Sequence, residues 1–346
     1  MDMRDVARIA GVSSATVSRV INGSPRVRPE TAEHVRRVIE ELKFYPNTNA
    51  AALKWGKSGT MGVIVPDITN PFFAEFIMFL EKILVDHNKE MLMVTTQLEL
   101  RHMQDVVRRM LVRRVDGVAL LASEVETESI EALLLHRTPL VTLDRRRVGP
   151  GLSDIYNDYQ PGIDEAVAYL KGLGHRRIAF IGGTAHLNTT DYRNQAFLTA
   201  LQKYGLRIYD EYMKAGDYHI DGGIRAMQEL LTLSQPPTAV MTANDLTAIG
   251  ALRLIHERGL DVPRDISIIG FDDTEFCRIL HPPLTSIRLS REDYAKTFFH
   301  ALTEGCEAPD AIGKQYSVST SLVVRSSSGP APLPRHIHKG PTKSKD

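Results

Sequence analysis

Residues 5–22, DVARIAGVSSATVSRVIN, have the pattern of two short helices joined by a tight turn. Val6 and Ala10 lie one helical turn apart, and Val17 opens a second helical period. Gly11 falls between the two periods, where a tight turn needs a residue that tolerates a positive φ. The pattern predicts a helix-turn-helix, a motif whose second helix enters the major groove of DNA.

Both predicted helices have a residue that can cap the N-terminus, because Asp2 precedes the first and Ser13 begins the second. Hydroxyl, amide and guanidinium groups contact phosphates and base edges, and Arg19 is the candidate for direct base readout. This window alone also fits an ordinary helical hairpin with a solvated face. The exposed face of the second helix is expected to carry Ser14, Ala15, Ser18, Arg19 and Asn22.

The 346 residues are balanced in charge, with 42 Lys or Arg against 42 Asp or Glu. Residues 1–58 nevertheless hold ten Lys or Arg against six Asp or Glu, so a basic head precedes an acidic remainder. Two cysteines, Cys277 and Cys306, show no disulfide or metal-ligand spacing, so neither a metal nor a cofactor is expected. Without a signal peptide or an apolar run of about 18 residues, the chain is expected to be cytoplasmic and not membrane-bound.

Pro29 stands where a third helix would begin, and the alanine-rich stretch AAALK follows at residues 50–54. A helix shorter than about 12 residues is marginal in water, so this stretch should need a partner to become ordered. Beyond Ser326 the chain lacks an apolar period, and residues 328–346 are predicted to be a disordered basic tail.

From Met61 onward, short apolar runs alternate with amphipathic stretches, which predicts a parallel sheet with helices on both faces. The pattern occurs twice and indicates an α/β fold of two doubly wound halves, a clamshell. Strands are predicted at 61–66, 90–95, 116–121, 139–144, 177–181, 239–242 and 266–271, and helices at about 71–88, 101–114, 127–135, 161–173, 191–204, 221–233 and 245–258.

Ligands of such sheets bind beyond the carboxyl ends of the strands. The segments at those ends combine aromatic faces with carboxylates, amides and a guanidinium, a mixture that suits a sugar-like or heterocyclic molecule. Each of these residues also has an ordinary explanation; Asn244, for example, can cap the helix that follows it. The segments expected to face one cleft are Pro66–Phe73, Ser123, Asp144, Gly182–Arg193, Thr242–Asp245 and Phe271–Asp273.

Together these pieces resemble the lactose/galactose-repressor (LacI/GalR) family of bacterial transcription factors, from about Asp5 to Ser327. The matching segments include DVARIAGVSSATVSRVING, GVIVPDITNPFFAE, GHRRIAFIGG, PTAVMTANDLTAIGALR and GLDVPRDISIIGFDD. The resemblance implies a homodimer that reads a pseudo-palindromic operator, and a regulatory domain like a periplasmic sugar-binding protein.

The domains implied are a helix-turn-helix head at 1–46, a hinge helix and linker at 47–59, an effector and dimerisation domain at 60–327, and the tail at 328–346. Within 60–327, the N-subdomain is expected at about 60–160 and 290–319, and the C-subdomain at about 161–289 and 320–327. Because the tail lacks leucine heptads, a dimer is expected rather than a tetramer.

Residue by residue, the resemblance assigns base contacts to Ser14, Ala15 and Arg19, and phosphate contacts to Thr16, Ser18 and Asn22. Leu53 matches the leucine that enters the minor groove, where an apolar wedge unstacks a base step and bends the DNA. Effector contacts are implied for Phe72, Phe73, Ser123, Asp144, Thr189, Arg193, Tyr218, Asn244, Asp245 and Asp272. Leu187 departs from an arginine of purine-responsive members, so a sugar or sugar acid is expected instead.

The function implied is a repressor whose operator affinity is controlled by a small carbohydrate in the interdomain cleft. An enzyme is not expected, since no nucleophile–base pair, metal set or phosphate loop stands out. A free sugar-binding protein would not explain the DNA-binding head. The remaining alternative is a catabolite-control-type global regulator that responds to a protein partner.

Overall fold

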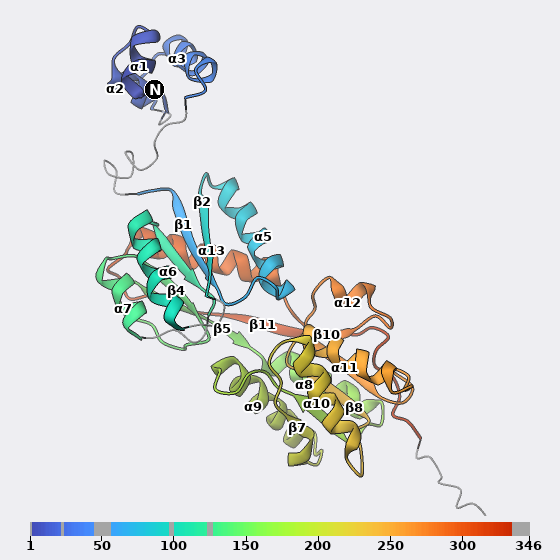
Figure 1. Cartoon of the computed structure of the whole chain (residues 1–346). Coiled ribbons are helices and arrows are strands. Elements are labelled where there is room, and N and C mark those ends of the chain that lie inside the picture. The colour runs from blue at the N-terminus through green and yellow to red at the C-terminus, as the bar shows by residue number, and fades with distance from the viewer. Residues whose placement is uncertain (1, 22–23, 45–56, 97–99, 123–126, 334–346) are drawn as a thin grey trace, which may run out of the picture. The chain divides into compact units, whose positions relative to one another are not determined.

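The computed structural model describes residues 2–21, 24–44, 57–96, 100–122 and 127–333. The chain divides into two compact units, residues 1–58 and residues 59–346, which are described separately (Figure 1). A membrane-spanning helix is absent from the described part of the chain.

The first unit is a small helical head. Asp2 accepts hydrogen bonds from the backbone N–H of Arg4 at 2.7 Å and of Asp5 at 3.1 Å, so the predicted cap is present. Ser13 likewise accepts from the N–H of Thr16 at 3.1 Å. The turn between the first two helices contains Gly11 with φ of 63°, which confirms the predicted left-handed turn position. The helices are α1 (Met3–Ile9), α2 (Ser14–Ile21) and α3 (Pro29–Glu41).

One apolar cluster joins the three helices of the head. Val6 on α1, Val17 on α2 and Val35 on α3 are each fully buried in it. Val6 and Val17 have the helical spacing that the sequence predicted. The three helices bury one shared core, which none of them could form alone.

The second unit contains the predicted α/β alternation. Its strands are β1 (Thr60–Val65), β2 (Glu90–Thr95), β3 (Gly117–Leu120), β4 (Leu140–Leu143), β5 (Leu152–Asp158), β6 (Ile178–Ile181), β7 (Met213–Lys214), β8 (Ala239–Thr242), β9 (Ser267–Asp272), β10 (Thr285–Leu289) and β11 (Gln315–Val323). Its helices are α5 (Pro71–Asp86), α6 (Leu100–Arg113), α7 (Thr127–Leu135), α8 (Gln160–Gly172), α9 (Asn188–Lys203), α10 (Ile220–Thr232), α11 (Asp245–Glu257), α12 (Phe276–Ile279) and α13 (Arg291–Glu307), with a 3-10 turn η1 (Asp210–Tyr212).

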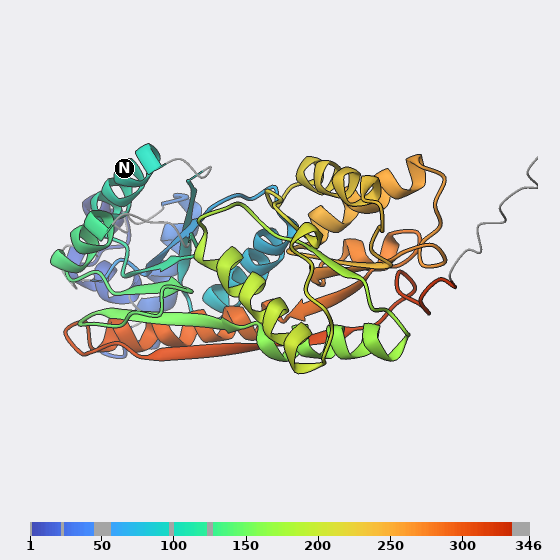
Figure 2. The same ribbon diagram turned by 90° about the horizontal axis from the view of Figure 1, so that it is seen from below.

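These strands form two lobes that share one strand. We call β1–β5 with α5, α6, α7 and α13 the first lobe, and β6–β10 with α8–α12 the second lobe. The strand order is β2-β1-β3-β4-β5-β11-β10-β9-β8-β6-β7. Residues 315–319 of β11 pair with β5 in parallel, and residues 320–323 pair with β10 in the antiparallel sense. Figure 2 shows β11 running from one lobe into the other.

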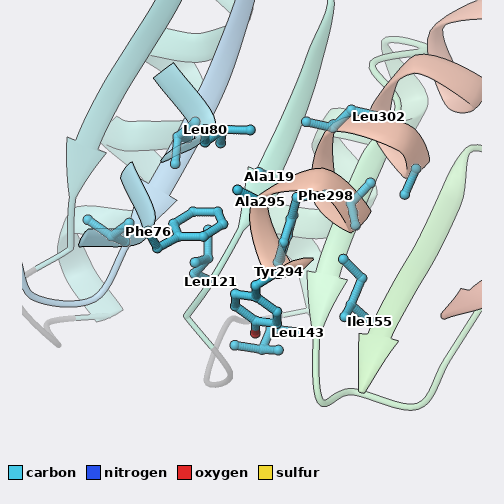
Figure 3. Close-up of a cluster of buried hydrophobic side chains, with 14 of the residues drawn as sticks. Phe76, Leu80, Ala119, Leu121, Leu143, Ile155, Tyr294, Ala295, Phe298 and Leu302 are labelled. Carbon is cyan, nitrogen blue, oxygen red and sulfur yellow. The ribbon is translucent and has the colours of Figure 1, made fainter. Parts of the chain in front are cut away.

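The core of the first lobe depends on a helix from the far end of the sequence. Tyr294 and Phe298 of α13 pack edge-on against Phe76 of α5, with ring centroids 5.5 and 5.4 Å apart. Figure 3 shows α13 side chains beside Ala119 and Ile155 of the sheet. The first lobe is therefore complete only when α13 has joined it.

The strands and helices predicted between residues 60 and 272 are present, with ends that differ by at most three residues. The apolar pattern did not predict β5, β7, β10, β11, α12 or α13. The tail prediction was wrong for its first residues, since Ser328 and Gly329 are buried and Ala331 donates its N–H to Leu173. The buried His175 ring lies 2.9 Å from the Gly329 carbonyl oxygen. This tertiary contact orders the start of the tail, and the composition of the tail gives no sign of it. Residues 334–346 lie outside the described residues.

Candidate DNA-binding face and effector cavity

The predicted base-reading residues lie on the outer face of α2. Ser14, Ala15 and Arg19 are exposed, whereas Thr16 and Ser18 are half-buried. The Thr16 hydroxyl lies 2.9 Å from the Ser13 hydroxyl, at the N-terminus of the helix. An exposed guanidinium beside small side chains lets the helix backbone approach a groove closely. Two further predicted DNA contacts, Asn22 and Leu53, lie outside the described residues.

A cavity of about 550 Å³ lies in the second unit and is lined by both lobes. Its size suits a small molecule. Ser123 lies outside the described residues. Of the other predicted effector residues, Phe72, Phe73, Thr189, Arg193, Tyr218, Asn244 and Asp272 line the cavity, whereas Asp144 and Asp245 do not.

Arg193 on α9 is the charged centre of the cavity wall. Its guanidinium stacks on the Phe271 ring at 4.2 Å, donates to the Ala243 carbonyl and lies 3.6 Å from the Asp272 carboxylate. Burial lowers the pKa of Arg193, but Tyr159 and the neighbouring acidic groups outweigh burial, and the net pKa is above the usual value. The guanidinium therefore stays charged.

Asp272 ends β9 and faces Arg193 within the second lobe. Burial raises the pKa of the Asp272 carboxyl above its usual range, while Arg193 acts in the opposite direction. Because the two groups lie 3.6 Å apart, they form a loose pair that a ligand hydroxyl can bridge.

Asn244 and Tyr218 form the adjacent part of the wall. Asn244 caps α11, because its Oδ1 accepts from the Thr247 N–H at 2.9 Å, so the alternative role foreseen for it is confirmed. Its Nδ2 donates to the Tyr218 carbonyl at 2.8 Å. The Tyr218 hydroxyl lies 2.9 Å from that of Thr190, and the ring covers Gly183, where a Cβ would sit 2.0 Å from the ring carbon Cζ.

Asp144 lies behind the wall rather than in it. The residue is fully buried, and its carboxylate accepts from the Asn157 N–H at 2.8 Å, from Asn157 Nδ2 at 2.9 Å and from the Tyr159 hydroxyl at 2.6 Å. Burial raises the pKa of Asp144, and these hydrogen bonds oppose that rise. Asp144 thus orients two side chains that line the cavity.

Asp245 also holds the wall from behind. Its carboxylate accepts from the Ser286 hydroxyl at 2.7 Å and from the Thr274 N–H at 2.8 Å, which fixes the loop after β9. Burial raises the pKa of Asp245. A direct effector contact by Asp144 or Asp245 stays a prediction.

An ion pair within the first lobe also contacts the second-lobe loop that carries Asp272. Arg291 at the start of α13 binds the Glu75 carboxylate at 2.9 Å and donates to the carbonyl groups of Asp272 and Asp273. Glu75 on α5 also accepts from the Glu275 N–H at 3.0 Å. The pair links two first-lobe helices to the second-lobe loop that carries Asp272.

Sequence reasoning missed several lining residues. Asn157 and Tyr159 lie at the end of β5, which has little apolar signal, and Tyr294 lies on the unpredicted α13. Asp67 belongs to a loop that was expected to face the cleft, but it was not singled out. The apolar spacing of Tyr294 and Phe298, one helical turn apart, was a usable signal for α13.

Comparison with known proteins explains this combination of a head and a two-lobed cavity. The family model for bacterial regulatory proteins of the lacI family matches residues 2–47, and that for a periplasmic binding protein-like domain matches residues 167–328. Catabolite control protein A of Priestia megaterium is 35% identical over 87% of this chain and 91% of its own length. The chain belongs to the lacI family of bacterial regulatory proteins.

Other members of the lacI family match over nearly the whole chain. The ribose operon repressor of Escherichia coli K12 is 32% identical, covering 94% of this chain and 99% of the repressor. The solved lac repressor dimer bound to operator and an anti-inducer has a TM-score of 0.84 at 26% identity, covering 95% of this chain and 99% of that one. A CelR–cellobiose complex has a TM-score of 0.72 at 29% identity, covering 95% and 100%. These matches confirm the fold class and the family read from the sequence.

Proposed function

We propose that this lacI-family regulator represses transcription as a homodimer on a pseudo-palindromic operator, and that a small carbohydrate in the cavity lowers its operator affinity. The observation that carries the proposal is the cavity itself. It is lined by both lobes, and Arg193, Asn244 and Asp272 stand among aromatic side chains in it. Aromatic faces hold the apolar face of a sugar ring, while the polar groups bind its hydroxyls.

On the DNA side, the proposal assigns base contacts to Ser14, Ala15 and Arg19, and phosphate contacts to Thr16 and Ser18. Arg19 is expected to carry most of the discrimination, about 1–3 kcal/mol for a bidentate contact to guanine. Asn22 and Leu53 keep the phosphate and minor-groove roles predicted for them. The proposal includes action in the cytoplasm, where operator DNA lies, and it assigns no catalytic step to the cavity.

On the effector side, direct contacts are assigned to the predicted residues that line the cavity, and Asp144 and Asp245 position that wall. A ligand that touches both lobes favours one lobe orientation, and operator affinity can change only by its differential affinity for the two orientations. Two relatives support this assignment. One is named as the repressor of a ribose operon, and the other, CelR, was solved in complex with cellobiose.

Fluorescence anisotropy with a palindromic duplex that has a central CG step tests the proposal at one fixed salt concentration. Tight binding that one sugar releases is the expected result, and Arg19→Ala should weaken operator binding while Arg193→Ala should abolish release. Operator binding that no sugar or sugar acid changes would move the assignment to a catabolite-control-type regulator. The 35% identity to catabolite control protein A is the observation that favours this second candidate.

A further inference from the structure

The loop after β4 connects the first lobe to the second through one arginine. The guanidinium carbon of Arg146, in this first-lobe loop, lies 4.2 Å from the ring centroid of Tyr192 on α9, in the second lobe. It also lies 5.6 Å from the ring centroid of Tyr156 on β5, in the first lobe. A guanidinium within about 6 Å of an aromatic centroid is attracted to the face of the ring. Arg146 therefore contacts both lobes at once.

The backbone of this loop has an unusual conformation. Asp144 and Arg146 each have a φ of 53°, in the left-handed region that residues with a Cβ rarely adopt. Such a conformation persists only where the surrounding structure fixes it, and it is a reason to look for a function. The direction of the Arg146 side chain is therefore imposed from outside the loop.

A buried carboxylate on β5 fixes the loop. Asp154 is fully buried, and its Oδ2 accepts from the Arg146 N–H at 2.9 Å. Its Oδ1 accepts from the Arg145 N–H at 3.2 Å and from the Thr142 hydroxyl at 2.6 Å. Burial raises the pKa of Asp154 to about 6, although these donors oppose the rise, so the carboxylate is ionised at about pH 8. Charge-assisted bonds to two successive N–H groups hold the backbone from which the Arg146 side chain extends.

The contact lies beside the cavity and is not part of its wall. Tyr192 directly precedes Arg193, which lines the cavity, whereas neither Arg146 nor Tyr192 is a lining residue. Arg146 is exposed and Tyr192 is half-buried, so either side chain can be replaced without opening a buried core. A substitution at Arg146 can thus change the orientation of the lobes and leave the cavity contacts in place.

We propose that Arg146 and Tyr192 form a latch that favours the lobe orientation of this structure before any ligand binds, and that Asp154 is the positioning residue of the latch. The inference goes beyond the proposed function, because it concerns the chain without effector or operator. A cation–π contact at a partly exposed site should favour this orientation about two- to fivefold. A molecule that binds only this orientation gains at most the same factor in affinity.

Double electron–electron resonance on the ligand-free, full-length protein at about pH 8 measures the lobe orientations. Glu131→Cys on α7 and Gln202→Cys on α9 place one nitroxide label on an exposed helix position of each lobe. Cys306→Ser removes the half-buried native thiol, and Cys277 is buried. The distance distribution should contain one main population in the protein with an intact latch. Arg146→Met should raise the other populations about two- to fivefold relative to the main one.

Variants of the second partner separate the latch from a general loss of structure. Tyr192→Leu should shift the distribution as Arg146→Met does, whereas Tyr192→Phe keeps the ring and should leave it unchanged. The double variant Arg146→Met with Tyr192→Leu should shift it no further than either substitution alone. Arg207→Met is the matched control, because Arg207 lies 4.9 Å from the Tyr209 ring within the second lobe, and its loss should leave the distribution unchanged.

Two measurements address the role of Asp154. Asp154→Asn keeps the size of the side chain and removes its charge, so it should shift the distribution as Arg146→Met does and add nothing when the two are combined. Hydrogen-exchange mass spectrometry of the protein with Asp154 intact should show a protected amide at Arg146, which decides the matter if Asp154→Asn fails to fold.

An unchanged distribution in Arg146→Met overturns the latch, and so does an equal shift in Arg207→Met. Additive shifts from Arg146→Met and Tyr192→Leu also overturn it, because the two side chains would then act separately. An unshifted Asp154→Asn protein, or rapid exchange at the Arg146 amide, overturns the positioning role of Asp154. Operator binding and its release by a sugar are measured in the anisotropy assay, so the proposed function stands or fails independently of the latch.

Discussion

Arg291, which pairs with Glu75 and donates to the second-lobe loop, offers a quantitative test of how this contact region is stabilised. Arg291→Met keeps the length of the side-chain stem and removes the ion pair with Glu75 together with the hydrogen bonds to Asp272 and Asp273. The two charged side chains are 11% and 19% exposed, so the pair is mostly but not fully desolvated. Removing one partner of a fully buried pair costs about 3–5 kcal/mol.

With partial exposure, the lower end of that range applies, about 3 kcal/mol. Since 1 kcal/mol shifts the Tm of a domain of this size by about 2–4 °C, the variant should melt roughly 6–12 °C below the wild-type protein. Differential scanning calorimetry at fixed protein concentration measures the shift. Arg264→Met is the matched control, because Arg264 pairs with Asp261 in an exposed contact and its loss should cost less than about 1 kcal/mol.

A double-mutant cycle with Glu75→Gln isolates the pair. The coupling free energy should be about 1–3 kcal/mol, because the two side chains are in direct contact. A Tm for Arg291→Met within about 2 °C of the control variant, or purely additive effects of the two substitutions, would refute the reasoning that the Arg291–Glu75 pair stabilises the protein.

Three further outcomes are expected. Gly183→Ala should cost about 1–3 kcal/mol of stability and weaken effector binding at least tenfold, since its Cβ would displace the Tyr218 ring; unchanged calorimetric titrations would contradict this. Burial lowers the pKa of His175 from 6.5, so the unfolded chain takes up the proton first and stability falls as pH drops below about 6.5. Urea denaturation between pH 7 and 5 should therefore show a shallower pH dependence for His175→Gln, and parallel curves would rule out that assignment. Asp2→Ala should destabilise the head by about 1 kcal/mol through loss of the cap, and equal amide hydrogen exchange in α1 would count against it.

The sequence predicted those parts of the fold in which one face or both faces are apolar. The strand MGVIV and the buried spacing of Val6 and Val17 carry their own signal, so the head and most strands of the sheet could be read directly. The strands LSDIYND and QYSVSTSLV could not, because they are rich in polar residues and owe their place to neighbouring strands.

The candidate site divides in the same way. Asn244 follows β8, Asp272 ends β9, and Arg193 lies on the helix after β6. These strands have a clear apolar pattern, so the segments beyond their carboxyl ends were predicted to share a cleft. Asn157 carried no such signal, since its orientation depends on Asp144, 13 residues away across two adjacent strands. A side chain whose role is set by a tertiary hydrogen bond cannot be recognised from local spacing.

The placement of α13 has a consequence for how the chain is made. During synthesis the strands of the first lobe leave the ribosome early, but Tyr294, Ala295, Phe298 and Leu302 of its core follow only after all strands of the second lobe up to β10. The first lobe therefore exposes part of its apolar core until the strands of the second lobe up to β10, and then α13, have been translated. A chain stopped after residue 290 should bind a dye specific for exposed apolar surface, whereas one extended through β11 should not. The chain length at which dye binding is lost would show when the core of the first lobe is complete.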